Sequence, residues 1–219
     1  SEKNESGDLV LYVAIADVGK FVTPGSAMDK EAAERGTSVY FTQKVIPMLP
    51  EIISNDLCSL RPKEDRYCLV CKTSLSQAGE SKEVEFFQAI INSKSRLTYE
   101  KVAEQMKINK FSDPYAQSLK NLVDIYKILK KAKKNRGALE LDIPFYVPQL
   151  KGNKIEKFIN TSRNEAHLLI EECMLLANIC AAKILMKAKI PSIYRIHPKP
   201  DPLKIKSLEG FARSRKINV

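Results

Sequence analysis

The sequence predicts an α+β fold, in which a mixed, largely antiparallel sheet is flanked by helices. Three observations lead to this prediction. Short runs rich in β-branched residues recur at hairpin spacing in the first half of the chain, and long helical periodicities dominate the second half. The 219 residues, 44% of them hydrophobic, also suffice for a sizeable core.

The first predicted elements are a strand and a short helix. Residues 9–16 form a continuous apolar run, typical of a central strand that is buried on both faces. Residues 24–26 (PGS) then predict a turn and a helix cap. The helix is expected over residues 28–35, because Gly36 provides a typical C-terminal stop.

Further β-type runs alternate with polar connections along the chain. Strands are predicted over residues 38–45, 67–74, 84–91, 138–141, 154–160 and 192–196. Pro47 and Pro50 end the first of these, ahead of a helical turn at residues 51–57. The polar stretch 76–80 suits the connection of a hairpin.

Four more helices are expected, over residues 98–106, 114–136 and 162–189 and from Pro202 onward. Thr98 is a candidate N-cap for the first. The second has one apolar face, because apolar residues recur at four- and three-residue intervals. These residues are Tyr115, Leu119, Leu122, Tyr126 and Leu129. A basic run at residues 127–136 ends this helix, and we interpret it either as a solvated helix end or as a phosphate contact.

The helix at residues 162–189 carries polar groups through an apolar element. Residues 168–185 are apolar on nearly every side, which predicts burial all round, yet Glu171 and Glu172 lie among them. A mostly polar stripe recurs at helical spacing through Asn164, His167, Glu171, Leu175 and Asn178. Two interpretations remain open. The groups could satisfy one another or pair with Arg163 in a structural network, or they could line a wet cavity for a polar ligand.

Composition narrows the class of partner. Lys and Arg number 36 against 26 Asp and Glu, a formal net charge of +10, which favours a polyanion such as nucleic acid. Tyr40 and Tyr99 are candidate platforms for stacked bases, although either could be an ordinary packing residue. The sequence contains no GxGxxG, Walker, HExxH or GxSxG motif, so dinucleotide, P-loop, zincin and α/β-hydrolase chemistry is not indicated.

Cysteine usage and hydropathy indicate a cytoplasmic protein. The five cysteines are an odd number, which favours reduced thiols. The pair Cys68 and Cys71 lies in a predicted strand without a second CxxC, and His167 and His197 form no recognisable ligand set, so no metal site is expected. No apolar run is long enough to cross a bilayer.

Nine collinear blocks connect the chain to a known family. They are residues 13–18 (VAIADV), 24–29 (PGSAMD), 35–41 (RGTSVYF), 46–50 (IPMLP), 54–60 (SNDLCSL), 96–99 (RLTY), 163–167 (RNEAH), 170–178 (IEECMLLAN) and 194–198 (YRIHP). In this order and spacing they resemble the RNB catalytic domain of the ribonuclease II/ribonuclease R exoribonucleases, and residues 35–40 favour the ribonuclease R type. The match is weakest over residues 103–160.

The resemblance implies an activity and roles for three residues. Family members degrade single-stranded RNA processively from 3′ to 5′, releasing nucleoside 5′-monophosphates with the help of Mg²⁺. Tyr40 matches the aromatic residue that stacks on the terminal base and helps to set the length of the end product. Tyr99 matches a residue that contacts the terminal nucleotides, and Glu171 matches a glutamate of the same pocket. A cytoplasmic monomer with no membrane partner is expected.

The family's catalytic aspartates precede the first buried strand, where this chain has residues 1–6 (SEKNES) instead. Asp8 and Asp17 do not belong to that set. We therefore expect residues 1–219 to be an internal part of a single RNB domain, with the aspartate cluster upstream and the catalytic arginine and S1 domain downstream. No catalytic residue and no metal ligand is assigned within the chain, which is expected to be inactive alone. The alternatives are a non-catalytic RNA-binding or regulatory homologue and, third, a structural interaction domain.

Overall fold

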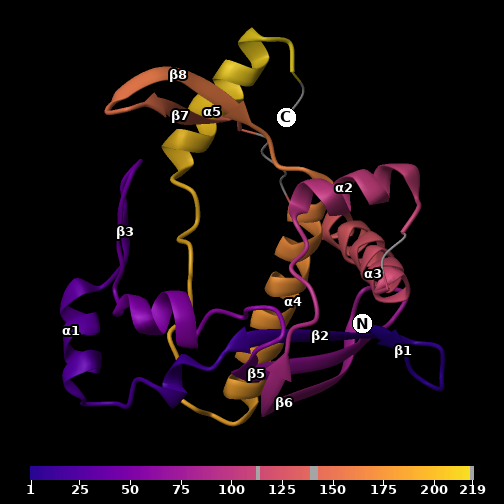
Figure 1. The fold of residues 1–219 in the computed structure, drawn as a ribbon. Coiled ribbons are helices and arrows are strands. Elements are labelled where there is room, and N and C mark those ends of the chain that lie inside the picture. Colours follow the sequence, from indigo (N-terminus) through magenta and orange to yellow (C-terminus); the bar gives the residue numbers. More distant parts are fainter. Residues whose placement is uncertain (112–113, 139–142, 218–219) are drawn as a thin grey trace. The chain divides into compact units, whose positions relative to one another are not determined.

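A computed structural model of the chain describes residues 1–111, 114–138 and 143–217. They belong to two compact units, Ser1–Ala181 and Ala182–Val219. The first unit holds every described strand together with most of the helices, and the second holds the C-terminal helix (Figure 1). The predicted α+β class is confirmed.

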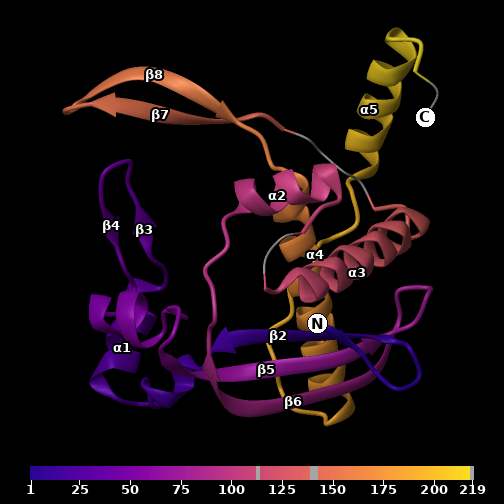
Figure 2. The same cartoon turned by 45° about the vertical axis from the view of Figure 1, so that its right-hand side comes forward.

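The main sheet has four antiparallel strands in the order β1-β2-β5-β6. Its strands are β1 (Glu2–Lys3), β2 (Leu9–Ala16), β5 (Asp65–Leu75) and β6 (Ser81–Asn92). The three long strands lie side by side in both views (Figures 1 and 2). A hairpin turn joins β5 to β6, as predicted, and the amide of Ser76 closes it on the carbonyl of Glu80 at 2.9 Å.

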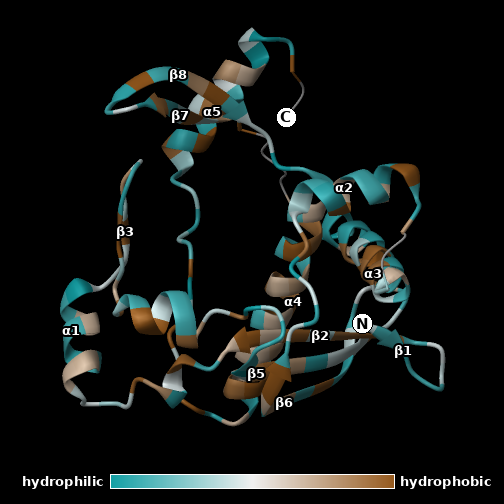
Figure 3. Ribbon diagram, viewed as in Figure 1, coloured by the Kyte–Doolittle hydropathy of each residue, from teal (hydrophilic) through white to brown (hydrophobic). Residues whose placement is uncertain are grey.

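The core lies where α3 (Ala116–Asn135) and α4 (Glu165–Lys187) pack on this sheet. Leu11 and Cys71 from the sheet meet Ile125 from α3 and Cys180 from α4, all almost fully buried. Apolar colour gathers along β2 and β5 (Figure 3). The predicted apolar face of α3 is confirmed, since Leu119, Tyr126 and Leu129 are buried.

Two predictions of complete burial were wrong. In β2 only Leu9, Val10 and Leu11 are buried, while Ile15 is 49% exposed, because the core covers one end of the strand. Helix α4 buries one side, and its other side is exposed through Ile170, Met174, Leu175 and Ile179. An apolar sequence thus marks α4 as a core helix, but in the described part of the chain α3 and the sheet contact only one of its faces.

A short helix and a small hairpin connect β2 to β5. Helix α1 (Ala27–Arg35) begins at Ser26, whose hydroxyl accepts a hydrogen bond from the amide of Asp29, and it ends at Gly36 with φ +68°. The predicted strand at 38–45 is instead a two-stranded hairpin of β3 (Val39–Tyr40) and β4 (Val45–Ile46). The amide of Phe41 bonds to the carbonyl of Lys44 at 2.8 Å, so the chain reverses inside the predicted strand.

The remaining elements follow the predictions in part. Expected elements are present as η2 (Ile52–Leu57), α2 (Tyr99–Ile108), β8 (Lys154–Thr161) and α5 (Pro202–Ser214). Strand β7 (Phe145–Lys151) was not predicted, because Pro148 argues against a strand. Among the described residues it pairs only with β8, and an unpaired edge tolerates proline. Of the strand predicted at 138–141, residues 139–141 lie outside the described part.

The strand predicted at 192–196 was wrong. Residues 190–201 have neither helix nor strand, and the Ile193 side chain is fully exposed, so its β-branched composition finds no partner strand among the described residues. In the whole described part of the chain, no helix is both long and apolar enough to span a membrane.

Candidate RNA-binding surface

The first turn of α4 carries a polar cluster. The Asn164 side-chain oxygen accepts hydrogen bonds from the amides of Ala166 at 3.1 Å and His167 at 3.2 Å, which caps the helix. The same oxygen lies 2.8 Å from Nδ1 of His167. The cap therefore fixes both the start of α4 and the orientation of the imidazole.

Tyr99 stacks on this imidazole. The ring centroids of Tyr99 and His167 are 3.9 Å apart and the ring planes differ by 18°. Tyr99 is the first residue of α2, and the hydroxyl of Thr98 caps that helix by accepting from the amide of Lys101 at 3.3 Å, as predicted. Because one face of the phenol ring is occupied and the residue is 43% exposed, the ring can offer a stacking partner its other face.

Glu171 lies one helical turn after His167, on the same side of α4. One carboxylate oxygen accepts from Nη1 of Arg163 at 2.8 Å, and the other lies 3.9 Å from Nζ of Lys133. The side chain is 37% exposed. The predicted pairing with Arg163 is thus present, and Glu171 and Tyr99 flank the same histidine.

Glu172 has a different role from Glu171. Its side chain is 7% exposed and accepts a hydrogen bond from Nζ of Lys133 at 2.8 Å, a contact that joins α4 to α3. The sequence indicated that this buried carboxylate needs a partner, but it did not identify Lys133, which lies 39 residues earlier in the basic run. Of the two interpretations of the polar stripe on α4, the structural network is present between Arg163 and Glu171. Asn178, at the other end of the stripe, is exposed.

Tyr40 lies on the β3–β4 hairpin and is 78% exposed. The base of this hairpin is held at two points: Arg35 Nη1 donates to the carbonyl of Pro47 at 3.1 Å, and the Ser38 hydroxyl accepts from the amide of Met48 at 2.9 Å. Among the described residues no contact joins Tyr40 to Tyr99 or Glu171. The structure therefore brings two of the three predicted site residues together and leaves the third on a separate hairpin.

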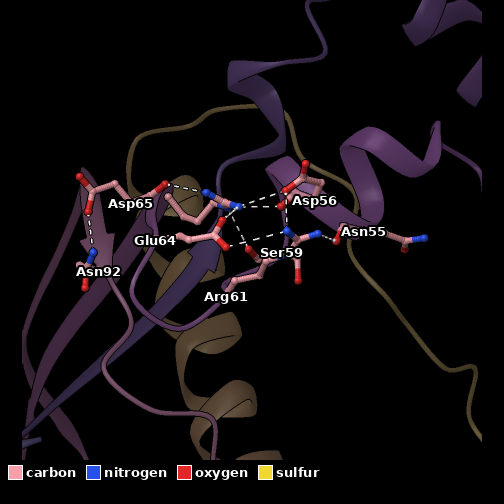
Figure 4. A network of polar contacts seen from close by, with 8 residues as sticks. Asn55, Asp56, Ser59, Arg61, Glu64, Asp65 and Asn92 are labelled. Carbon is pink, nitrogen blue, oxygen red and sulfur yellow. Dashed lines mark hydrogen bonds and ion pairs between the residues drawn. The ribbon is translucent and has the colours of Figure 1, made fainter.

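Sequence reasoning did not identify the arginine pair that anchors the segment after this hairpin (Figure 4). Arg66 is 13% exposed; its guanidinium bonds to the carbonyls of Asp56 and Ser59 and pairs with the carboxylates of Asp56 and Glu64. Arg61 reaches the same Asp56 carboxylate at 3.3 Å. The network fixes the end of η2 against β5. Its only signal in the sequence was an arginine that directly follows two acidic residues at the start of a predicted strand.

The basic run of α3 surrounds a hollow of about 580 Å³, lined by Lys127, Lys130, Lys131, Lys133 and Lys134 with Ala138. Several of these charges are already compensated. Lys127 Nζ lies 3.4 Å from Asp124 and Lys130 Nζ lies 3.2 Å from Glu165. The run is therefore partly a network of ion pairs, and a phosphate contact stays a prediction.

The described residues do not form a metal centre, since no three of their His, Cys, Asp or Glu side chains come together as a possible ligand set. All five cysteines, each in a described segment, are free thiols. Burial raises the pKa of the Cys71 thiol to about 12 and that of Cys173 to about 11, so neither is an activated nucleophile.

Comparison with known proteins decides the family. The model of the RNB domain matches residues 1–219. The chain belongs to the RNB family. It is 43% identical over 219 residues to ribonuclease R of Vibrio parahaemolyticus and 44% identical over 215 residues to ribonuclease R of Escherichia coli. These alignments cover 96% and 95% of this chain but 26% of each relative, so the chain spans about a quarter of the relatives' length.

Solved structures agree with this assignment. Mycoplasma genitalium ribonuclease R in complex with ribose-methylated single-stranded RNA superposes with a TM-score of 0.92 at 32% identity, covering 99% of this chain and 34% of that one. Yeast Ssd1, described as a pseudonuclease, gives a TM-score of 0.74 at 17% identity over 98% of this chain and 26% of that chain, which shows a shared fold alone. The resemblance to the ribonuclease R type is confirmed.

Proposed function

We propose that the protein is a processive 3′-to-5′ exoribonuclease that degrades single-stranded RNA to nucleoside 5′-monophosphates. The observation that carries the proposal is the continuous similarity to ribonuclease R over nearly the whole chain, at more than 40% identity. The formal charge of +10 supports a polyanionic substrate. In this proposal the chain lines the RNA channel and part of the pocket for the terminal nucleotide.

Three residues form the proposed wall of that pocket. Tyr40 stacks on the terminal base, for which its high exposure is suitable. Tyr99 presents the ring face opposite His167 to the neighbouring nucleotide. Glu171 accepts hydrogen bonds from ribose hydroxyls; its pairing with Arg163 keeps the carboxylate oriented and offsets its repulsion of phosphate.

Mg²⁺ is part of the proposal for the full-length protein, but the described residues of this chain do not fit it. A magnesium site that activates water needs carboxylate oxygens, and no suitable group of them occurs in the described segments. In this proposal the metal ligands belong to parts of the full-length protein outside the chain, and the 219 residues are expected to be inactive by themselves. The protein is proposed to be a cytoplasmic monomer, which suits its free thiols.

The experiment is a decay assay with the full-length protein, Mg²⁺ and an unstructured RNA labelled at its 5′ end. Full-length RNA that is converted to a short 5′-labelled end product, with few intermediates and without early release of a labelled mononucleotide, supports processive decay in the 3′-to-5′ direction. Chromatography of the released nucleotides should give 5′-monophosphates. Internal fragments, or mononucleotide released first from the labelled end, would disprove the proposal.

A second candidate is a non-catalytic RNA-binding homologue. It stays open because the alignments to ribonuclease R cover 26% of each relative, and the catalytic segments of the proposal lie outside the aligned part. The same assay separates the two candidates: RNA that binds tightly and stays intact in Mg²⁺ indicates the binding protein, and salt-dependent affinity then distinguishes it from a structural domain with no RNA partner.

A further inference from the structure

A cavity of about 650 Å³ opens between α2, α3 and the start of α4, and Arg163, the partner of Glu171, is its one lining residue with a role in the proposed function. Its volume falls within the range of roughly 300 to 1,000 Å³ that is typical of small-molecule sites. All of its lining residues belong to the first compact unit. The cavity is next to the Tyr99–His167 stack in sequence, but neither ring lines it.

The chemistry of the lining is amphipathic. Met106 and Leu168 are half-buried and provide apolar surface, and Ala103, Val123 and Tyr126 line the cavity with little exposed area of their own. A flat, weakly polar group such as a nucleobase gains from leaving water for such a surface. Ser162 and Asn109 add a hydroxyl and an amide of the kind that can bond to base edges or ribose.

Four cations surround this surface, namely Lys107 from α2, Lys127 and Lys130 from α3, and Arg163 before α4. Glu165 is the one acidic residue in the described lining, and Lys130 compensates it at 3.2 Å. Lys127 is paired with Asp124 at 3.4 Å and Arg163 with Glu171 at 2.8 Å, but neither of these carboxylates lines the cavity. Lys107 has no ion pair within the described residues. The excess of cations in the lining therefore favours an anion, with Lys107 as the uncompensated charge.

We propose that this cavity is a nucleotide-binding site, in which the apolar surface takes the base and Lys107 and Lys127 take the phosphate. The site goes beyond the proposed function, because none of Tyr40, Tyr99 and Glu171 lines it. Its ligand can come from two sources with the same chemistry, a free nucleoside 5′-monophosphate or a nucleotide unit within an RNA chain.

The test is nuclear magnetic resonance of methionine methyl groups in the full-length protein, titrated with uridine 5′-monophosphate. Met106 lines the cavity, whereas Met28 in α1 and Met174 in α4 do not and serve as internal references. Met106→Leu assigns the signal. We expect a saturable shift of Met106 alone. Uridine without phosphate, and inorganic phosphate without a base, should each bind at least roughly tenfold more weakly, because each uses half of the site.

The variant Lys107→Ala/Lys127→Ala should weaken binding by roughly tenfold, because two charge-assisted contacts are lost. Lys110→Ala/Lys120→Ala is the matched control, since it removes the same charge from two exposed lysines outside the cavity and should leave binding unchanged. A short RNA that shifts Met106 where the mononucleotide does not identifies RNA as the source and still supports the site.

No shift of Met106 with either ligand would overturn the proposal. Equal weakening in both double variants would also overturn it, since the effect would then be one of net charge. Uridine that binds as tightly as uridine 5′-monophosphate would overturn it as well. RNA decay is measured on the same samples. An inactive protein whose Met106 still responds refutes the proposed exoribonuclease and leaves this site standing, while an active protein with a silent Met106 does the reverse.

Discussion

The contact between Lys133 and Glu172 should be the main polar tie between α3 and α4. Glu172 is 7% exposed and Lys133 is 16% exposed, and their charged atoms are 2.8 Å apart. Replacing Lys133 by Met keeps the apolar stem but leaves the carboxylate buried with no cation at hydrogen-bonding distance. Breaking a buried pair from one side costs about 3–5 kcal/mol, and we expect roughly 3 because residual exposure lets water reach the carboxylate.

The assay is hydrogen exchange of the α4 amides in the full-length protein, which reports the free energy of local opening. Lys133→Met should lower it by about 3 kcal/mol, and adding Glu172→Leu should restore most of the loss, because no unpaired charge then remains buried. Lys130→Met is the control, since its pair with Glu165 is half exposed and should contribute less than about 1 kcal/mol. Equal effects at Lys133 and Lys130, or no recovery in the double variant, would refute this reasoning.

Three other predictions follow from the structure. Gly79→Ala should destabilise the chain by more than about 1 kcal/mol in urea unfolding, because φ is +84° and the new Cβ would lie 2.8 Å from Cβ of Ala132. Gly25→Ala is the control: at φ +78° with no atom within 4 Å of the new Cβ, it should show only the cost of a positive φ. Burial raises the pKa of Cys71 to about 12, against 9.0 for a free thiol, so the folded state holds the proton more tightly than the unfolded state. The free energy of unfolding is then unaffected below pH 9 and falls between pH 9 and 12. A free energy of unfolding that stays constant over this interval would contradict the assignment. Tyr99→Ala should raise KM for RNA by an amount equivalent to roughly 1–3 kcal/mol with less change in kcat, which kinetics on short oligonucleotides can check, and an unchanged KM would remove Tyr99 from the site.

Local sequence signals located most of the fold. Ser26, Gly36 and Thr98 marked helix ends because capping depends on a few neighbouring residues. The hairpin of β5 and β6 was also predictable, since β-branched runs and a polar turn define it locally. Whether residues 192–196 form a strand could not be judged from local signals, because a strand needs a partner strand and composition does not supply one.

The candidate site was predictable only in part. Helical spacing placed His167 and Glu171 on one side of α4, and the structure confirms Arg163 as a partner. The stack of Tyr99 on His167 joins residues 68 positions apart, and Lys133 lies 39 positions from Glu172. Such contacts depend on how helices pack, which periodicity does not encode. Residue reasoning gave Tyr40 and Tyr99 only as candidate stacking platforms, and the family resemblance assigned their roles.

The most direct test of the account is the length of the final RNA product. Full-length protein carrying Tyr40→Ala is compared with the unaltered protein and with Phe41→Ala, which removes the neighbouring exposed aromatic residue of the same region. If Tyr40 stacks on the terminal base, its loss should change the length of the smallest product, while Phe41→Ala should leave it unchanged. Identical end products in all three proteins, or RNA that none of them shortens, would contradict the account.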